Sequence, residues 1–146
     1  ASTSWITSAR SATTALNRYI TRIANMATNF YQDGDVLDYT NTTGAAIAAG
    51  APVAIGNIIG IALVDIAISA VGSVAIEGVW KVTKATGNAW VQGAKVIWDV
   101  SAAKFDHGGA TPATGDISNC CVAAYAAASG DTVGYVKLNV GMGTVT

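Results

Sequence analysis

GAPVAIGNIIGIALVDIAISAVGSVAIEGVW, residues 50–80, places the first constraint on the fold class of this chain. It holds two charged side chains, Asp65 and Glu77, and no charge occurs from Tyr39 to Val64. A membrane helix needs about 20 apolar residues without strong breaks, and the length here is sufficient. Glycine recurs through the stretch, however, and Pro52 interrupts it. Short apolar runs bounded by Gly, Pro and Asn favour buried strands joined by turns.

A membrane span stays as the weaker alternative for the same stretch. Lys81 and Lys84 follow it and could orient a spanning helix. The spacing of Gly56 and Gly60 also matches a helix-dimer pattern, but Asn57 lies inside it. The inside of a β fold therefore explains the pattern better than a membrane does.

The β pattern continues from Phe30 to the end of the chain. Turn-forming stretches such as QDGD, NTTG, ATGN, DHGG and ASGD separate the apolar runs. The sequence predicts an all-β domain over residues 30–146, a small β-sandwich or barrel. The candidate strands are Val36–Tyr39, Val53–Ile55, Ile58–Val64, Val74–Ile76, Val79–Val82, Lys95–Asp99, Lys104–Phe105, Cys120–Ala124 and Val133–Asn139.

Residues 1–29 differ in kind and predict an N-terminal arm. Leu16, Tyr19, Ile20 and Ile23 follow the i, i+3, i+4, i+7 spacing of one helical face, which predicts an amphipathic helix over about residues 12–28. The preceding segment is polar apart from Trp5 and Ile6. We expect the apolar residues of the arm to anchor it against a neighbouring protein surface: Trp5, Ile6, Leu16, Tyr19, Ile20 and Ile23.

A faint internal repeat suggests that the β domain consists of two similar halves. AAGAPVAIG at 48–56 resembles VQGAKVIWD at 91–99, an offset of 43 residues. ALVDIAISAVGSVAI at 62–76 resembles CCVAAYAAASGDTVG at 120–134, an offset of 58 residues. A duplication with 15 extra residues near KFDHGGATPATGDIS in the second half would explain both offsets.

The composition limits the function classes. The chain has 146 residues, enough for one domain with a real core, but only 12% are charged, about half the usual share. A surface with so few charges suits close contact with sister subunits or a protein lattice. The net charge of −1 argues against binding a polyanion such as nucleic acid. The charges are uneven, because residues 1–32 hold three arginines and no acid, whereas the remainder has five lysines and nine acids.

The residues that could carry chemistry do not form a catalytic, cofactor or metal site. His107 stands alone in FDHGG, where an exposed turn histidine is the expected interpretation. Asp33, Asp35 and Asp38 lack the later glycine and glutamate of a calcium loop. No GxxxxGK[ST] phosphate loop occurs. The chain is therefore expected not to be an enzyme.

The cysteines and tryptophans leave two questions to the structure. Neighbouring side chains of a strand point to opposite faces, so Cys120 and Cys121 are expected to be reduced structural thiols that do not bridge each other. Trp80, Trp90 and Trp98 are expected to be core or interface anchors. If they were exposed, they could instead form a platform for glycans or a host surface, which is the alternative function.

Residues 30–139 contain an ordered series of blocks: FYQDGDVLDYTN, AAGAPVAIGNIIGIALVDIA, GSVAIEGVWKVTKATG, VQGAKVIWD and AAASGDTVGYVKLN. This series resembles the capsid cement, or head decoration, proteins of tailed bacteriophages, a family sometimes labelled as recombinases. The missing phosphate loop argues against the recombinase label. The family pattern usually begins at a methionine, here Met26, so the preceding 25 residues are either an extension or vector-derived sequence.

The resemblance implies a structural virion protein, assembled in the host cytoplasm, that binds the outer surface of the phage capsid. It further implies a homotrimer whose partner is the major capsid protein, with no cofactor, no nucleic acid and no membrane. Such a protein would stabilise the shell by bridging its subunits. The apolar residues of the arm would then contact the capsid or a sister subunit.

Overall fold

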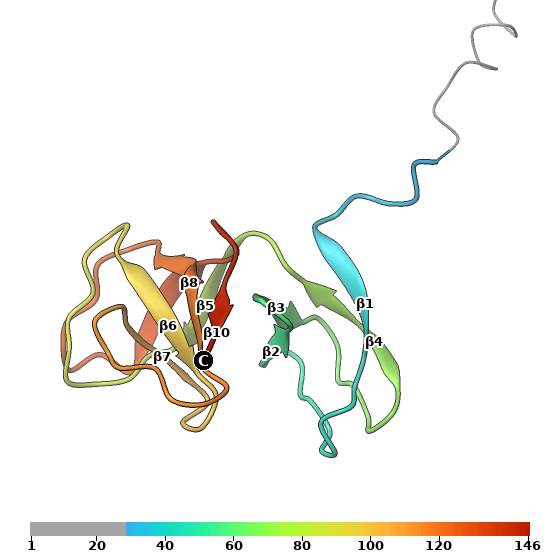
Figure 1. The fold of residues 1–146 in the computed structure, drawn as a ribbon, viewed down its shortest axis with the longest axis horizontal. Coiled ribbons are helices and arrows are strands. Elements are labelled where there is room, and N and C mark those ends of the chain that lie inside the picture. Colours follow the sequence, from blue (N-terminus) through green and yellow to red (C-terminus); the bar gives the residue numbers. More distant parts are fainter. Residues whose placement is uncertain (1–28) are drawn as a thin grey trace, which may run out of the picture. The chain divides into compact units, whose positions relative to one another are not determined.

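Ten β-strands and no helix make up residues 29–146, the part of the chain that the computed structural model describes (Figure 1). The all-β prediction is confirmed, while the predicted helix of the arm lies outside the described residues. In chain order the strands are β1 (Val36–Thr40), β2 (Pro52–Ile55), β3 (Ile58–Ala62), β4 (Val71–Ala75), β5 (Val79–Thr83), β6 (Lys95–Asp99), β7 (Lys104–His107), β8 (Ile117–Ala123), β9 (Val133–Lys137) and β10 (Thr144–Val145).

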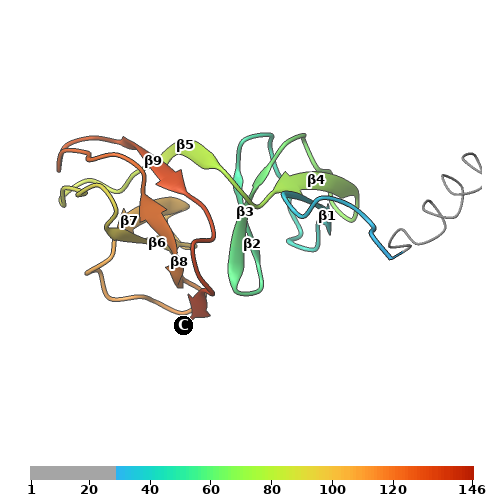
Figure 2. The ribbon, with the colours of Figure 1, turned by 90° about the horizontal axis from the view of Figure 1, so that it is seen from above.

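The first sheet has four antiparallel strands in the order β1-β4-β3-β2 (Figure 2). In this sheet Val53 lies opposite Gly60, and Ala62 lies opposite Val74. Directly opposed side chains share one face of a sheet. This face carries a small apolar cluster to which the loops contribute Ile66.

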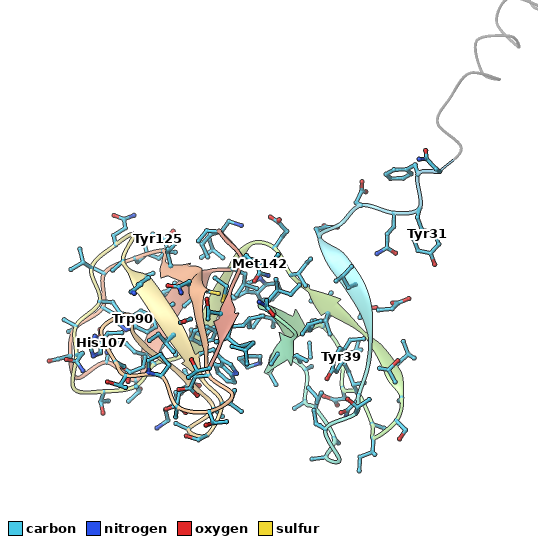
Figure 3. All side chains as sticks on the ribbon, in the orientation of Figure 1. Tyr31, Tyr39, Trp90, His107, Tyr125 and Met142 are labelled. Atoms are coloured by element: carbon cyan, nitrogen blue, oxygen red, sulfur yellow. The ribbon has the colours of Figure 1, made fainter. Side chains whose placement is uncertain are left out.

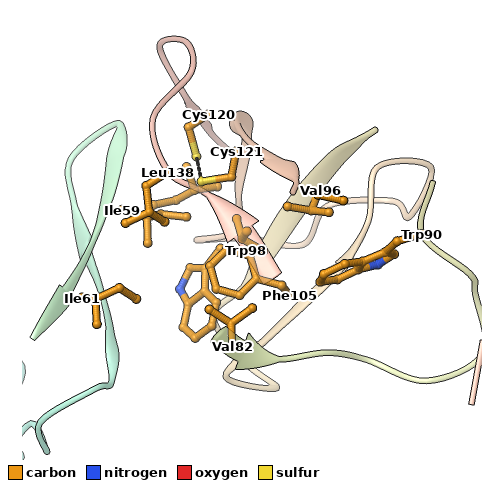
Figure 4. Packing of buried hydrophobic residues seen from close by; sticks show 13 residues of the cluster. Ile59, Ile61, Val82, Trp90, Val96, Trp98, Phe105, Cys120, Cys121 and Leu138 are labelled. Carbon is orange, nitrogen blue, oxygen red and sulfur yellow. Dashed lines mark hydrogen bonds between the residues drawn. The ribbon is translucent and has the colours of Figure 1, made fainter. Parts of the chain in front are cut away.

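The second sheet has the order β5-β9-β8-β6-β7, with β10 added to β8. A parallel bridge joins Lys84, just after β5, to Phe105 in β7, and the Ala85 N–H donates to the Phe105 carbonyl at 2.8 Å. The two ends of this strand order therefore meet, and the sheet curls around its own core. In that core the rings of Trp98 and Phe105 lie 5.0 Å apart between centroids (Figure 4).

The two antiparallel sheets pack as a sandwich, and β3 joins the core of the second sheet. Ile59 and Ile61 of β3 belong to the same buried cluster as Trp98 and Leu138 (Figure 4). Asn139, which follows β9, stabilises this contact with three hydrogen bonds. Its Nδ2 donates to the carbonyls of Ile59 at 2.8 Å and Ile76 at 2.6 Å, and its Oδ1 accepts from the Ile59 N–H at 3.1 Å.

The prediction of two similar halves is confirmed by matching strand orders and matching turn contacts. Strands β1 to β4 form the first repeat, and β5, β6, β8 and β9 form the second, with β7 inserted. Ile47 exchanges backbone hydrogen bonds with Ile66, and Trp90 does the same with Ala127. The first offset of 43 is therefore correct, whereas the second is not 58: it is 61 between Ile66 and Ala127 and 62 between Val71 and Val133. The difference arises because Ala- and Gly-rich segments align in several registers, and hydrogen bonds decide between them.

Residues 50–80 form β2, β3, β4 and the start of β5. The prediction of buried strands is confirmed, and residues 29–146 contain no helix long and apolar enough to cross a membrane. Strand bounds agree with the prediction to within two residues. The exceptions are β4 and β8, which begin three residues earlier, and β10, which the sequence did not suggest.

Candidate functional site

The predicted contact residues of the arm lie outside the described residues, so their role stays a prediction. They are Trp5, Ile6, Leu16, Tyr19, Ile20 and Ile23. The candidate site must therefore be sought on the β domain.

The tryptophans do not form an exposed platform. Trp90 and Trp98 are only 3% and 6% exposed and belong to the core of the second sheet. Trp80 is partly buried against the same core, and its Nε1 donates to the Glu77 carbonyl at 2.8 Å. The core interpretation is confirmed for Trp90 and Trp98, which removes the feature on which the glycan-binding alternative depended.

The two cysteines lie side by side, so the expectation that they point to opposite faces was wrong. Their sulfur atoms are 3.4 Å apart, and both thiols are free and buried. The alternation of β8 fails because Asn119 has a left-handed φ of 67° and the register with β6 shifts at this point. The hydrogen bond between the thiols, followed by burial, raises the pKa of Cys120, and the same bond lowers the pKa of Cys121.

The single histidine and the three aspartates of DGDVLD lie in or next to strands. His107 is the last residue of β7 and half-buried, not part of an exposed turn, and its Nδ1 accepts from the Gly109 N–H at 3.1 Å. Asp38 lies exposed within β1, while Asp33 and Asp35 precede that strand. Among residues 29–146 no three His, Cys, Asp or Glu side chains gather as metal ligands would.

Exposed apolar side chains form the more informative feature of the surface. In the second repeat Tyr125, labelled in Figure 3, is exposed. It meets the exposed Tyr135 edge to face, with ring centroids 5.5 Å apart. Val133 lies two residues before Tyr135 on the same face of β9 and is exposed too. We call Tyr125, Val133 and Tyr135 the tyrosine patch.

The first repeat also exposes apolar side chains. Val71 matches Val133, because the two residues occupy the same register positions opposite Thr40 and Thr83. The turn between β3 and β4 adds exposed Val64 and Ile68. We call Val64, Ile68 and Val71 the valine patch. The sequence did not reveal either patch, because alternation along a strand does not tell which of its two faces a second layer covers.

Charge divides the repeats. Residues 33–77 contain five acids and no lysine or arginine, whereas residues 78–146 contain five lysines and four aspartates. The first repeat is therefore acidic and the second nearly neutral. With the three arginines of residues 1–32, the chain has a basic, an acidic and a neutral section in order.

A repeated β fold with exposed apolar patches and buried thiols and indoles has the features of a structural protein that binds other proteins. The sequence profile of the phage cement protein family matches residues 31–138. The chain belongs to this family. A search of curated proteins found no match. The protein is accordingly a structural component associated with a bacteriophage capsid, and its place is the virion.

Proposed function

We propose that this protein binds the outer surface of a phage head as a homotrimer and stabilises the shell by bridging neighbouring subunits of the major capsid protein. The family match over residues 31–138 carries the proposal, since it covers both repeats. The low charge and the two apolar patches support it.

The mechanism is thermodynamic and needs no chemical step. A protein that binds only the assembled lattice lowers the free energy of that lattice by mass action. Many copies, each touching more than one shell subunit, multiply a modest contact energy. The tyrosine and valine patches suit this role, because two similar surfaces on one chain can contact two similar surfaces on adjacent subunits.

The N-terminal arm is proposed as a second attachment point. Its predicted helix would place Leu16, Tyr19, Ile20 and Ile23 against the shell or a neighbouring subunit, with Trp5 and Ile6 as further anchors. Arg10, Arg18 and Arg22 lie among these residues and would favour an acidic partner surface.

Co-sedimentation with expanded heads that lack the protein tests the proposal. The full chain should pellet with the heads to a saturating number of copies and raise the temperature at which they release DNA. A variant without residues 1–25 should keep the fold of the β domain and bind more weakly. A Tyr125→Ser, Tyr135→Ser double variant should also bind more weakly, and exposed Lys104→Ser serves as the matched control.

The assay separates the parts of the proposal. If the folded full chain does not bind expanded heads at all, the proposed function is wrong. If it binds and the truncated chain binds equally well, the arm is not an attachment point. Electron micrographs of decorated heads that show isolated single copies, with no threefold clusters, would contradict the trimer.

A further inference from the structure

The first repeat lacks a strand that the second repeat contains. In the second sheet β7 pairs with the outer edge of β6. Val96 lies opposite His107 at one end, and Asp99 lies opposite Lys104 at the other. Strand β2 is the equivalent of β6, yet the order β1-β4-β3-β2 ends there, with no strand of residues 29–146 on its outer edge. A groove lies between the start of β2, at Gly50 and Pro52, and Lys81, Thr83 and Ala103 of the second repeat.

The missing strand leaves the interior of the first repeat incompletely covered. Phe105 of β7 is 0% exposed, and with it in place Val82 and Trp98 of the second repeat are buried. The equivalent side chains of the first repeat, Tyr39 and Ile55, are only partly buried against their cluster. An unpaired strand edge beside half-covered apolar side chains is a template for an added strand.

The chain itself offers a matching segment. Residues 29–32, NFYQ, contain no helix or strand, and Phe30 and Tyr31 are 71% and 91% exposed. Strand β7 reads KFDH, with its buried phenylalanine also second of four residues. Placed in the register of β7, residues 29–32 would put Phe30 opposite Ile55 and Tyr31 opposite Ala54.

The direction of the missing strand requires a donor in a second copy. The bridge between Lys84 and Phe105 is parallel, so a strand in the equivalent position would run parallel to β1. Residues 29–32 are joined to β1 by only three residues, 33–35. Such a short link permits an antiparallel neighbour, whereas a parallel one needs a crossover of about a dozen residues.

We infer that residues 29–32 of one copy add a strand to the free edge of β2 in a second copy, with Phe30 entering the core of the first repeat as Phe105 enters that of the second. Charge favours this exchange, because the donor segment follows three arginines, and residues 36–77 of the accepting repeat hold three acids and no base. Donor and acceptor are different surfaces, so the contact is heterologous and can close a ring. The inference concerns two copies of this chain and does not rest on binding to a capsid.

Paired substitutions in the donor segment test the inference. Phe30→Ala should weaken self-association of the full chain by about tenfold or more, because it removes a phenyl group that the partner buries. Tyr31→Ala should weaken it less, since Tyr31 would take the position of half-buried Asp106, on the face of the strand opposite to Phe30. Both side chains are mostly exposed within one copy, so both variants should fold. Light scattering measures the mean mass in solution as a function of protein concentration. If the two substitutions lower this mass equally, the proposed register of residues 29–32 on β2 is wrong.

Cysteine cross-linking identifies the partner. An equimolar mixture of the single variants Tyr31→Cys and Ala54→Cys should give a covalent heterodimer on mild oxidation, while wild type should give none, because its own thiols are buried. Tyr31→Cys mixed with Val71→Cys, an exposed position on β4, is the control and should not react. If the first mixture gives no heterodimer, the inference is wrong. It is also wrong if a Tyr31→Cys, Ala54→Cys double variant cross-links only within one chain.

Discussion

Lys84 takes in the second repeat the position that Asn41 takes in the first. Asn41 Nδ2 donates to the Ala45 carbonyl at 2.7 Å, and Lys84 Nζ donates to the Asn88 carbonyl at 2.7 Å, each four residues along the chain. Both side chains are fully buried. An amide and an ammonium therefore hold equivalent turns closed, as expected because most buried polar groups in proteins are hydrogen-bonded.

Replacing Lys84 with methionine should lower the free energy of unfolding by about 1–3 kcal/mol, because the carbonyls of Ala85 and Asn88 lose their donor. The contact of Nζ with the Trp90 ring, 5.5 Å from its centroid, would be lost as well. Urea denaturation measures the change. Lys81→Met, at an exposed position of β5, is the matched control and should change stability little. An equal loss in both variants would mean that charge, not the hydrogen bonds, matters.

Asn139 should be the most sensitive position at the contact between the sheets. Asn139→Gly removes three hydrogen bonds to Ile59 and Ile76 while tolerating the left-handed φ of 48°, and should cost about 1–3 kcal/mol. Asn139→Ala should cost more, because alanine adds backbone strain. Asn139→Asp should also cost more than the glycine variant, since it places a carboxylate against two carbonyls. Thermal unfolding monitored by tryptophan fluorescence ranks the three, and an unchanged midpoint would contradict the assigned role.

Gly134 permits the close packing of β9 on Trp90. A Cβ at this position would collide with the Cζ3, Cη2 and Cε3 atoms of the buried indole. Gly134→Ala should therefore destabilise the protein by about 1–3 kcal/mol. Gly130→Ala is the control, because a Cβ there meets no atom within 4 Å. A Gly134→Ala variant with wild-type stability would show that Trp90 can move aside, contrary to its burial.

Asp99 should make the turn between β6 and β7 sensitive to acid. Its carboxylate accepts from the Ala102 N–H at 2.8 Å and the Ser101 hydroxyl at 2.7 Å, and these bonds lower its pKa from 3.8. A lowered pKa in the folded state gives stability that is present above pH 3.8 and is lost as the pH falls through the folded value. The stability difference between wild type and Asp99→Ala should thus shrink in acid. The exposed strand residue Asp38, changed to Ala, controls for removing one charge, and a difference that stays constant with pH would refute the prediction.

Local patterns in the sequence were sufficient for much of the fold. The apolar runs between Gly, Pro and Asn located nine strands, since β-strand formation needs only short segments bounded by turns. The offset of 43 was readable because AAGAPVAIG and VQGAKVIWD share a glycine just before equivalent strands, β2 and β6. The blocks that resemble cement proteins lie within these strands and turns, so the family resemblance is visible in the amino-acid sequence alone.

Two local features of the fold were not readable from sequence. Cys120 and Cys121 share the interior because a left-handed Asn119 breaks the alternation of β8, a backbone choice that asparagine allows but does not require. Lys84 is a charged residue of a kind usually found at the surface, yet it is buried because carbonyls of its own turn surround the ammonium.

Residue types at short range are enough to specify the strand-forming segments, the duplicated plan and the family. Long-range pairing alone settles which faces are buried, that β7 closes the second repeat, and that the equivalent edge of β2 stays open. The reason is that one alternating pattern is compatible with several pairings of distant segments, until one set of hydrogen bonds and packed side chains is formed.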